Sequence, residues 1–296
     1  MQAITGKTKL LGVIGHPVEH SLSPVMHNAA IAALSATEGE QVDYVYLPFP
    51  VKPEGLSAAV AGFEAVGLCG FNITIPHKQS IVAFLDEVSP VARAVGAVNT
   101  VWRTPTGWAG TNTDVEGFLA PLRARDRPWK GTQATILGAG GAARAIVAGC
   151  AELGCEAIVV VGRDRAKLDI FARSWVESPI AIAPLSTRLW EDLPAVLAQT
   201  DLLVNATPVG MHPQVDRTPV EASLLAQLPA EAIVYDLIYT PNPTRLLREA
   251  RQVGAVAIDG LEMLVQQGAA ALQLWLNRPV PVDVMRRSLQ EHLGSI

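Results

Sequence analysis

The chain has 296 residues, enough for roughly two domains, and at this size neither disulfides nor metal ions are needed to support a core. Hydrophobic residues make up 49% of the sequence and charged residues only 17%, which argues against disorder and favours a compact globular protein. The formal net charge of −5 gives no general attraction to nucleic acid or anionic lipid, although a local basic pocket could bind one phosphate.

The cysteines and apolar runs limit the cellular setting. Cys69, Cys150 and Cys155 form no CxxC pair and no cluster with the six histidines, which argues against a disulfide framework or a zinc site. The apolar stretch 10–14 is too short for a signal peptide, and the run 263–277 falls short of the roughly 20 apolar residues of a membrane span. We expect a cytoplasmic protein with no bound metal and no nucleic-acid or membrane partner.

The first part of the chain alternates strands with helices. Strands are predicted at 10–14, 42–47 and 68–75, a helix at 54–66, short helices at 81–85 and 90–94, and a hairpin at 97–102 and 107–110. Ser23 is the predicted N-cap of a further helix, with Pro24 at its first position. This order favours a mostly parallel sheet covered by helices.

A second alternation begins at Thr132, after a charged stretch (123–130) that we expect to be a linker or an exposed helix end. Predicted strands lie at 134–137, 157–161, 202–205, 233–236 and 255–258. One helix is predicted to open at the glycine turn 138–143 and to run to about Leu153, and another to span 166–175. This pattern predicts a doubly wound sheet. The last segment, 261–293, is expected to form one or two helices interrupted by Pro279 and Pro281.

A glycine-rich turn opens the first helix of this second part. Gly138, Gly140 and Ala143 occupy the three small positions of a G-x-G-x-x-G/A pattern between a predicted strand and a predicted helix. Such a turn presents backbone N–H groups at a helix N-terminus and lets a dinucleotide pyrophosphate approach closely. The alternative is an ordinary glycine-rich turn without a ligand.

The end of the next strand bears on the choice of dinucleotide. An acid at this point accepts the ribose 2′-hydroxyl of NAD, whereas the 2′-phosphate of NADP needs a cation. Here Gly162 is followed by Arg163, Asp164 and, further on, Lys167, so the cations favour NADP. A solvated charged loop is the alternative, and Asp164 would repel a 2′-phosphate unless it turns toward Arg165 or solvent.

Four polar clusters in the first part follow predicted strands or open helices. They are Ser21 to Asn28, Phe71 to Lys78, Gly96 to Thr100 and Gly110 to Asp114. Because ligands of open α/β sheets bind beyond the carboxyl ends of the strands, we expect these clusters to form one polar site.

With these clusters the chain resembles the shikimate dehydrogenase family, and the resemblance runs nearly end to end through Gly138 to Ala143, Asn205 to Met211, Tyr235 to Pro241 and Met263 to Gln267. It implies two α/β domains: a substrate domain at 1–113, a Rossmann domain for NADP at 114–262, and C-terminal helices at 263–296 that pack back on the substrate domain. It also implies reversible NADPH-dependent reduction of 3-dehydroshikimate to shikimate, an aromatic amino-acid and chorismate pathway step.

The resemblance implies roles for individual residues. Substrate binding falls on Ser21, Ser23, Thr74, Asn99, Asp114, Tyr239 and Gln267, and cofactor binding on Gly138, Ala139, Gly140, Gly141, Ala142, Arg163, Lys167, Thr207, Leu237 and Gly260. The family's catalytic pair falls on Lys78 and Asp114. An ammonium can stabilise the charge that hydride delivery places on the ketone oxygen and can then protonate it, which suits Lys78. The alternatives are a surface lysine and an N-cap of the predicted helix 115–122.

Departures from the family pattern keep other functions open. The family's Asn-Arg-Thr run is Gly162-Arg163-Asp164 here, so use of both NAD and NADP is conceivable, and a quinate/shikimate dehydrogenase using NAD is the second hypothesis. A non-catalytic protein that senses NADP or shikimate is the third, although it has no need of a proton-transfer pair. His77 is expected to pack or hydrogen-bond rather than catalyse, and the protein is expected to be a monomer or a homodimer.

Overall fold

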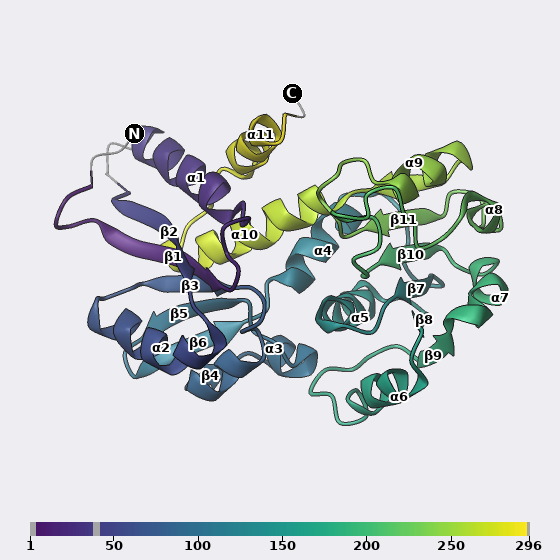
Figure 1. Ribbon diagram of the computed structural model, residues 1–296, viewed down its shortest axis with the longest axis horizontal. Helices are drawn as coiled ribbons and strands as arrows, with labels where there is room; N and C mark the ends of the chain where they lie inside the picture. The colour runs from purple at the N-terminus through teal and green to yellow at the C-terminus, as the bar shows by residue number, and fades with distance from the viewer. Residues whose placement is uncertain (1–3, 38–41, 295–296) are drawn as a thin grey trace. The chain divides into compact units, whose positions relative to one another are not determined.

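The computed structural model describes residues 4–37 and 42–294, which form two compact units (Figure 1). The first unit comprises Met1–Thr113 and Val265–Ile296, and the second comprises Asp114–Leu264. Among the described residues, no helix is both long enough and apolar enough to cross a membrane. Helix α10 (Gly260–Leu276) begins in the second unit and continues into the first.

The first unit contains a six-stranded sheet in the order β2-β1-β3-β5-β6-β4. Its strands are β1 (Lys9–Gly15), β2 (Tyr44–Pro50), β3 (Gly70–Ile73), β4 (Glu87–Val88), β5 (Thr100–Thr104) and β6 (Gly107–Thr111). Its helices are α1 (Ser23–Thr37), α2 (Leu56–Ala65), α3 (Pro90–Val95) and α11 (Val282–His292), with 3-10 turns η1 (Pro53–Gly55) and η2 (Ser80–Phe84). The last helix packs against α1, as Figure 1 shows.

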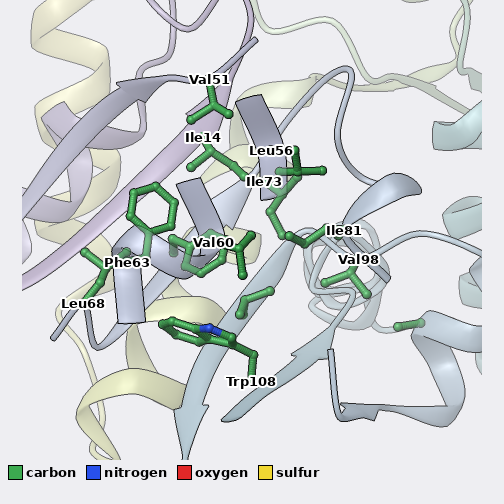
Figure 2. Close-up of a cluster of buried hydrophobic side chains, with 13 residues drawn as sticks. Ile14, Val51, Leu56, Val60, Phe63, Leu68, Ile73, Ile81, Val98 and Trp108 are labelled. Carbon is green, nitrogen blue, oxygen red and sulfur yellow. The ribbon is translucent and has the colours of Figure 1, made fainter. Parts of the chain in front are cut away.

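Strand β5 runs antiparallel to β3 and β6, whereas β1 pairs in parallel with β2 and β3. The predicted hairpin causes this reversal, so the sheet is mostly parallel rather than fully so. One layer of the core lies between the sheet and α2, where aromatic and branched side chains converge from both (Figure 2). Within it Phe71 contacts Trp108 edge to face, with ring centroids 5.3 Å apart, and Phe63 at 5.2 Å.

The prediction for the start of α1 is wrong by one residue. Ser23 is the first residue of the helix rather than its N-cap, because the first helical hydrogen bond runs from the amide of Met26 to the carbonyl of Leu22. The oxygen that precedes the helix belongs instead to Ser21, whose Oγ accepts from the Ser23 amide over 3.4 Å. Two serine side chains therefore lie at one helix start.

The second unit contains a parallel six-stranded sheet in the order β12-β11-β10-β7-β8-β9. Its strands are β7 (Gln133–Leu137), β8 (Ala157–Gly162), β9 (Leu185–Leu189), β10 (Leu202–Asn205), β11 (Ile233–Asp236) and β12 (Val256–Ile258). Its helices are α4 (Asp114–Arg123), α5 (Gly141–Leu153), α6 (Arg165–Arg173), α7 (Leu193–Leu197), α8 (Ala222–Leu225) and α9 (Arg245–Gln252), with a 3-10 turn η3 (Trp190–Asp192).

The strand order of this sheet reverses between β7 and β10. From β7 the chain proceeds outward through β8 and β9, then returns to the other side of β7 and proceeds through β10, β11 and β12. The loops that follow β7 and β10 consequently diverge, and a crevice at such a point is the usual ligand site of doubly wound sheets. The sequence prediction omitted β9 and the helices α7 to α9, although α9 is clearly amphipathic, with Leu246, Leu247 and Ala250 on its buried face.

Candidate active site

The polar clusters of the first unit meet at one edge of its sheet. The carboxyl ends of β1 and β3 lie side by side there, since the Thr74 amide donates to the Ile14 carbonyl over 2.9 Å. Asn99 reaches the same edge from the amino end of β5, because that strand is antiparallel. Val98 donates to the Lys78 carbonyl over 2.8 Å, so Lys78 lies beside this segment. Thr74, Lys78 and Asn99 therefore share an edge.

Buried hydrogen bonds fix the side chain of Asn99. Its Oδ1 accepts from the Thr113 amide over 2.8 Å, from Thr113 Oγ1 over 3.1 Å and from Thr100 Oγ1 over 2.9 Å. An oxygen held by three donors sets the orientation of the whole amide group, including the NH₂ group on its other side. The same bonds hold the backbone immediately before Asp114, which begins α4 and is half-buried.

A second buried chain of hydrogen bonds lies behind Asn99. The Tyr46 hydroxyl donates to Asn72 Oδ1 over 2.7 Å, and Asn72 Nδ2 donates to the Asn99 carbonyl and to Thr100 Oγ1, each over 3.1 Å. Burial raises the pKa of the Tyr46 phenol, against a smaller opposing effect of Ser23. The network thus runs from the start of α1 toward Asn99.

His27 packs beside this network. Its ring stacks on Tyr46 with centroids 4.2 Å apart and an interplanar angle of 10°, and Trp275 of α10 lies 5.7 Å away. Burial lowers the pKa of His27 to about 3, against a smaller opposing hydrogen-bond effect of Asn72. The imidazole is therefore neutral in the folded protein.

This shift predicts acid sensitivity of the fold. Because the folded pKa lies below the ordinary 6.5, protonation of His27 favours the unfolded chain, and stability falls as the pH drops below 6.5. We expect His27→Phe, which keeps the stacking, to lose less stability than the wild type, with a difference of about 2 kcal/mol by pH 5. Urea unfolding of both proteins at pH 7 and pH 5 measures this. Equal losses in both proteins would contradict a neutral buried His27.

The remaining residues of the predicted site divide between the units. Ser21 and Gln267 are half-buried in the first unit, and Gln267 precedes Gly268, where an added Cβ would meet the Met26 side chain of α1 at 2.2 Å. Tyr239 is half-buried in the second unit, in the loop after β11, and burial raises its pKa. His77 is buried and its Nε2 donates to the Val51 carbonyl over 2.6 Å, a packing role as predicted.

The glycine turn of the second unit contains two kinds of glycine. Gly138 has φ +100°, and a Cβ there would lie 3.1 Å from Thr207 Cγ2 and 3.2 Å from the Ala206 carbonyl oxygen, so the fold itself requires glycine. A Cβ at Gly140 or Gly141 would meet no protein atom within 4 Å. The absence of side chains at these two positions therefore fits the close approach of a ligand to the N-terminus of α5.

Asp164 has a structural task that the sequence prediction missed. It is the N-cap of α6, with Oδ1 accepting from the Lys167 amide over 3.1 Å. Its Oδ2 lies 3.9 Å from Lys167 Nζ, so the carboxylate turns toward Lys167 rather than toward Arg165. Arg163 and Lys167 are both exposed. The loop therefore presents the exposed Arg163 and the exposed Lys167, and Asp164 partly offsets the positive charge of Lys167.

Family models match three parts of the chain. "Shikimate dehydrogenase substrate binding domain" matches residues 13–101, "Shikimate / quinate 5-dehydrogenase" matches 122–264, and "Shikimate 5'-dehydrogenase C-terminal domain" matches 260–290. "Shikimate dehydrogenase (NADP(+))" of Gloeothece citriformis is 58% identical over 99% of this chain and 100% of its own length. The protein of the same name from Trichormus variabilis is 59% identical over 99% and 100%.

The chain belongs to the shikimate dehydrogenase family. A crystal structure of shikimate 5-dehydrogenase from Listeria monocytogenes, in complex with shikimate and NAD, matches it with a TM-score of 0.88 and 36% identity, over 98% of this chain and 99% of that one. The predicted family and the predicted two-domain α/β architecture, with C-terminal helices returning to the first unit, are confirmed.

Sequence reasoning missed the residues that support those of the family pattern. Asn72, Thr100 and Thr113 lie inside the polar clusters of the sequence, yet no role was predicted for them, and in the structure all three bind Asn99. Tyr46 gave no signal beyond strand propensity. In the second unit, Asn205 and Asp236 are the last residues of two adjacent strands. A polar residue at the end of an apolar strand is a sequence signal that could have identified both as candidate site residues.

Proposed function

We propose that this chain is an NADP-dependent shikimate dehydrogenase, which reversibly reduces 3-dehydroshikimate to shikimate with NADPH. The observation that carries the proposal is the similarity over the whole chain, at 58–59% identity, to relatives named for this activity with NADP(+). That name favours NADP over the NAD-dependent alternative. The presence of Lys78 and Asp114 supports an enzyme rather than a sensing protein.

The substrate is proposed to bind at the polar edge of the first unit. Its carboxylate would be held by Ser21 and Ser23, whose position at the start of α1 favours an anion through the helix dipole. Its ring hydroxyls would meet Thr74, Asn99 and Asp114, with Tyr239 and Gln267 completing the set. The fixed orientation of the Asn99 amide supports this, because a preset donor loses little entropy on binding. On this proposal residues 1–113 with 263–296 form the substrate domain.

The cofactor is proposed to bind at the strand reversal of the second unit, residues 114–262. The pyrophosphate would lie on Gly138, Ala139, Gly140, Gly141 and Ala142 at the start of α5. Arg163 and Lys167 would hold the 2′-phosphate, and Thr207, Leu237 and Gly260 would flank the nicotinamide half. The open space around Gly140 and Gly141 supports this placement.

In the proposed mechanism NADPH, when bound, supplies the hydride. The Lys78 ammonium stabilises the negative charge that develops on the ketone oxygen of the substrate and donates the proton that completes the hydroxyl group. Asp114 orients Lys78 and accepts from a substrate hydroxyl. In the reverse direction neutral Lys78 removes the hydroxyl proton. The hydrogen bonds from Thr113 to Asn99 hold the backbone beside Asp114 for this task.

An absorbance assay of the purified protein tests the function. Shikimate with NADP⁺ should produce the nicotinamide absorbance of NADPH, at a higher kcat/KM than with NAD⁺. Quinate as a second substrate separates the quinate/shikimate alternative. Binding of NADP⁺ without turnover of shikimate would instead support a sensing protein.

Ser21 provides a test of the substrate site. We expect Ser21→Ala to raise the KM for shikimate several-fold and to leave the KM for NADP⁺ nearly unchanged, because only shikimate presents its carboxylate there. Steady-state kinetics with each ligand varied measures both values. The exposed Ser57 of α2 gives a matched control in Ser57→Ala. Equal weakening of both ligands would contradict the assignment.

The setting of the enzyme is also a proposal. The three cysteines are free thiols, which supports a reducing cytoplasm. We propose a cytoplasmic enzyme whose partner is a small-molecule substrate and which acts as a monomer or a homodimer.

A further inference from the structure

A buried carboxylate links the carboxyl ends of β10 and β11. Asp236 and Asn205 are the last residues of these strands, pair in register and are fully buried. Asn205 Nδ2 donates to Asp236 Oδ1 over 2.9 Å, and the Ile238 amide donates to the same oxygen over 3.1 Å. Thr244 Oγ1 donates to Oδ2 over 2.7 Å. Three convergent donors suit an ionised carboxylate, which can only accept.

Asn205 connects this carboxylate to the loop after β10. Its Oδ1 accepts from the Thr207 amide over 3.0 Å and from Thr207 Oγ1 over 2.7 Å. The Val209 amide in turn donates to Thr207 Oγ1 over 3.2 Å. The position of Thr207 is therefore set by an amide whose other end is held by Asp236.

The loops that follow β10 and β11 contact two glycines of the proposed cofactor site, Gly138 and Gly260. Ala206 and Thr207 lie beside Gly138 of the glycine turn, within 3.2 Å of where a Cβ would stand. Leu237, which follows Asp236, places its carbonyl oxygen 2.1 Å from where a Cβ of Gly260 would stand. The carboxylate is thus connected to Gly138 through Asn205 and Thr207, and to Gly260 through the adjacent Leu237.

We propose that Asp236 is a positioning residue for the cofactor, which acts through Asn205 to hold Thr207 against the glycine turn. This role rests on the proposed function and extends it to two fully buried residues outside the proposed set of cofactor contacts. The Asn205 side chain must orient its NH₂ group toward Asp236 and its oxygen toward Thr207. The amide of Asn205 supplies a donor to Asp236 from its nitrogen and an acceptor to Thr207 from its oxygen.

The electrostatics of the pair agree with this. Burial raises the pKa of Asp236 to about 6, with a further increase from Asp259, while the Thr244, Ile238 and Asn205 hydrogen bonds oppose the shift. The carboxyl group is therefore ionised above pH 7, where it accepts from all three donors.

Asn205→Asp tests the link with little change of shape. The new carboxylate can still accept from Thr207, but it faces Asp236 without a donor, and two carboxylates at this separation repel. We expect the Kd for NADP⁺, measured by calorimetry at pH 8, to rise at least tenfold, while the KM for shikimate changes by less than threefold. At pH 6 a proton can bridge the two carboxyl groups, so the ratio of variant to wild-type Kd should fall.

The double variant Asn205→Asp with Asp236→Asn exchanges the two side chains, so that an amide NH₂ group at position 236 can donate to the carboxylate at position 205. We expect it to recover at least threefold of the lost NADP⁺ affinity, which a merely structural defect would not do. Thr244→Val is the control for stability. The change removes the hydrogen bond from Thr244 Oγ1 to Asp236 and also the N-cap of α9, because the same oxygen accepts from the Leu247 amide. It leaves Asn205 and Thr207 unchanged. It should lower the melting temperature and change the Kd for NADP⁺ by less than threefold.

Three outcomes would overturn the proposal: a folded Asn205→Asp protein with wild-type affinity for NADP⁺, an exchanged pair without recovery, or a Thr244→Val protein that loses as much affinity as Asn205→Asp. Because these are binding measurements, they are separate from the proposed function. A wild-type protein that binds NADP⁺ but does not oxidise shikimate would overturn the function and leave the Asp236 test intact.

Discussion

Replacing Lys78 by alanine should lower kcat about 10²-fold or more, with a much smaller effect on the Kd for NADP⁺. In the proposed mechanism, the substrate oxygen would lose both the cation that stabilises its developing charge and the group that gives it a proton. Lys78 lies at the sheet edge where Thr74 and Asn99 meet, so its loss affects chemistry rather than cofactor binding. Steady-state kinetics and an independent titration with NADP⁺ measure the two effects.

Two variants sharpen this test. Lys78→Arg keeps the positive charge but cannot readily release a proton, so it should recover substrate affinity and little of kcat. Lys7→Ala removes an exposed lysine at the opposite, amino end of β1 and should leave kcat unchanged. A folded Lys78→Ala protein with near-normal kcat would remove Lys78 from the mechanism.

Replacing Arg163 by alanine should weaken NADP⁺ binding by about 1.5–3 kcal/mol and NAD⁺ binding little, because the contact proposed for Arg163 is a charge-assisted one to the 2′-phosphate. This corresponds to roughly a 10- to 150-fold change in Kd. Arg165→Ala is the matched control, since Arg165 is an exposed arginine two residues away. Comparison of kcat/KM for both cofactors measures the effect. Loss of affinity for both cofactors alike would assign Arg163 a role other than reading the 2′-phosphate.

The position of Asp164 refines the same test. Because Asp164 caps α6, its removal affects both charge and helix stability, so Asp164→Asn, which keeps a capping side chain, is cleaner than Asp164→Thr. Either change should tighten NADP⁺ binding by removing a negative charge and releasing Lys167 from its partner. If Asp164→Asn leaves the preference for NADP⁺ unchanged, the carboxylate does not weaken discrimination.

The fold was predictable where the sequence repeats a simple period. The buried strands β7 and β8 and the helix α5 between them follow from apolar runs and a glycine turn. The observed bounds of both strands agree within one residue, and α5 begins within the turn and ends at Leu153 as predicted. β9 was missed because none of its side chains is fully buried, so it lacks the apolar run of a central strand. The offset at Ser23 arose because serine is a preferred N-cap residue, whereas in this structure the carbonyl of Leu22 accepts the first helical hydrogen bond.

The candidate site was less accessible for a different reason. Residues such as Ser21 and Lys78 stand in recognisable runs, and their membership in one sheet edge follows from topology alone. The residues that hold them depend on contacts between distant segments: Tyr46 reaches Asn72 across 26 positions, and Asn99 reaches Thr113 across 14. Such pairings follow from register, which a single sequence does not specify.

In the glycine turn after β7, the glycine that the backbone requires is a different residue from the glycines that leave room for a ligand. The fold requires glycine at Gly138, through its positive φ and the proximity of Ala206, whereas at Gly140 and Gly141 a Cβ would meet no protein atom within 4 Å and only the proposed cofactor calls for glycine. In a descendant chain released from catalysis, the latter two positions would be free to accumulate small side chains over generations, while Gly138 would stay invariant. Substitutions at positions 140 and 141 in a relative that keeps glycine at position 138 would therefore indicate that this relative no longer binds a dinucleotide.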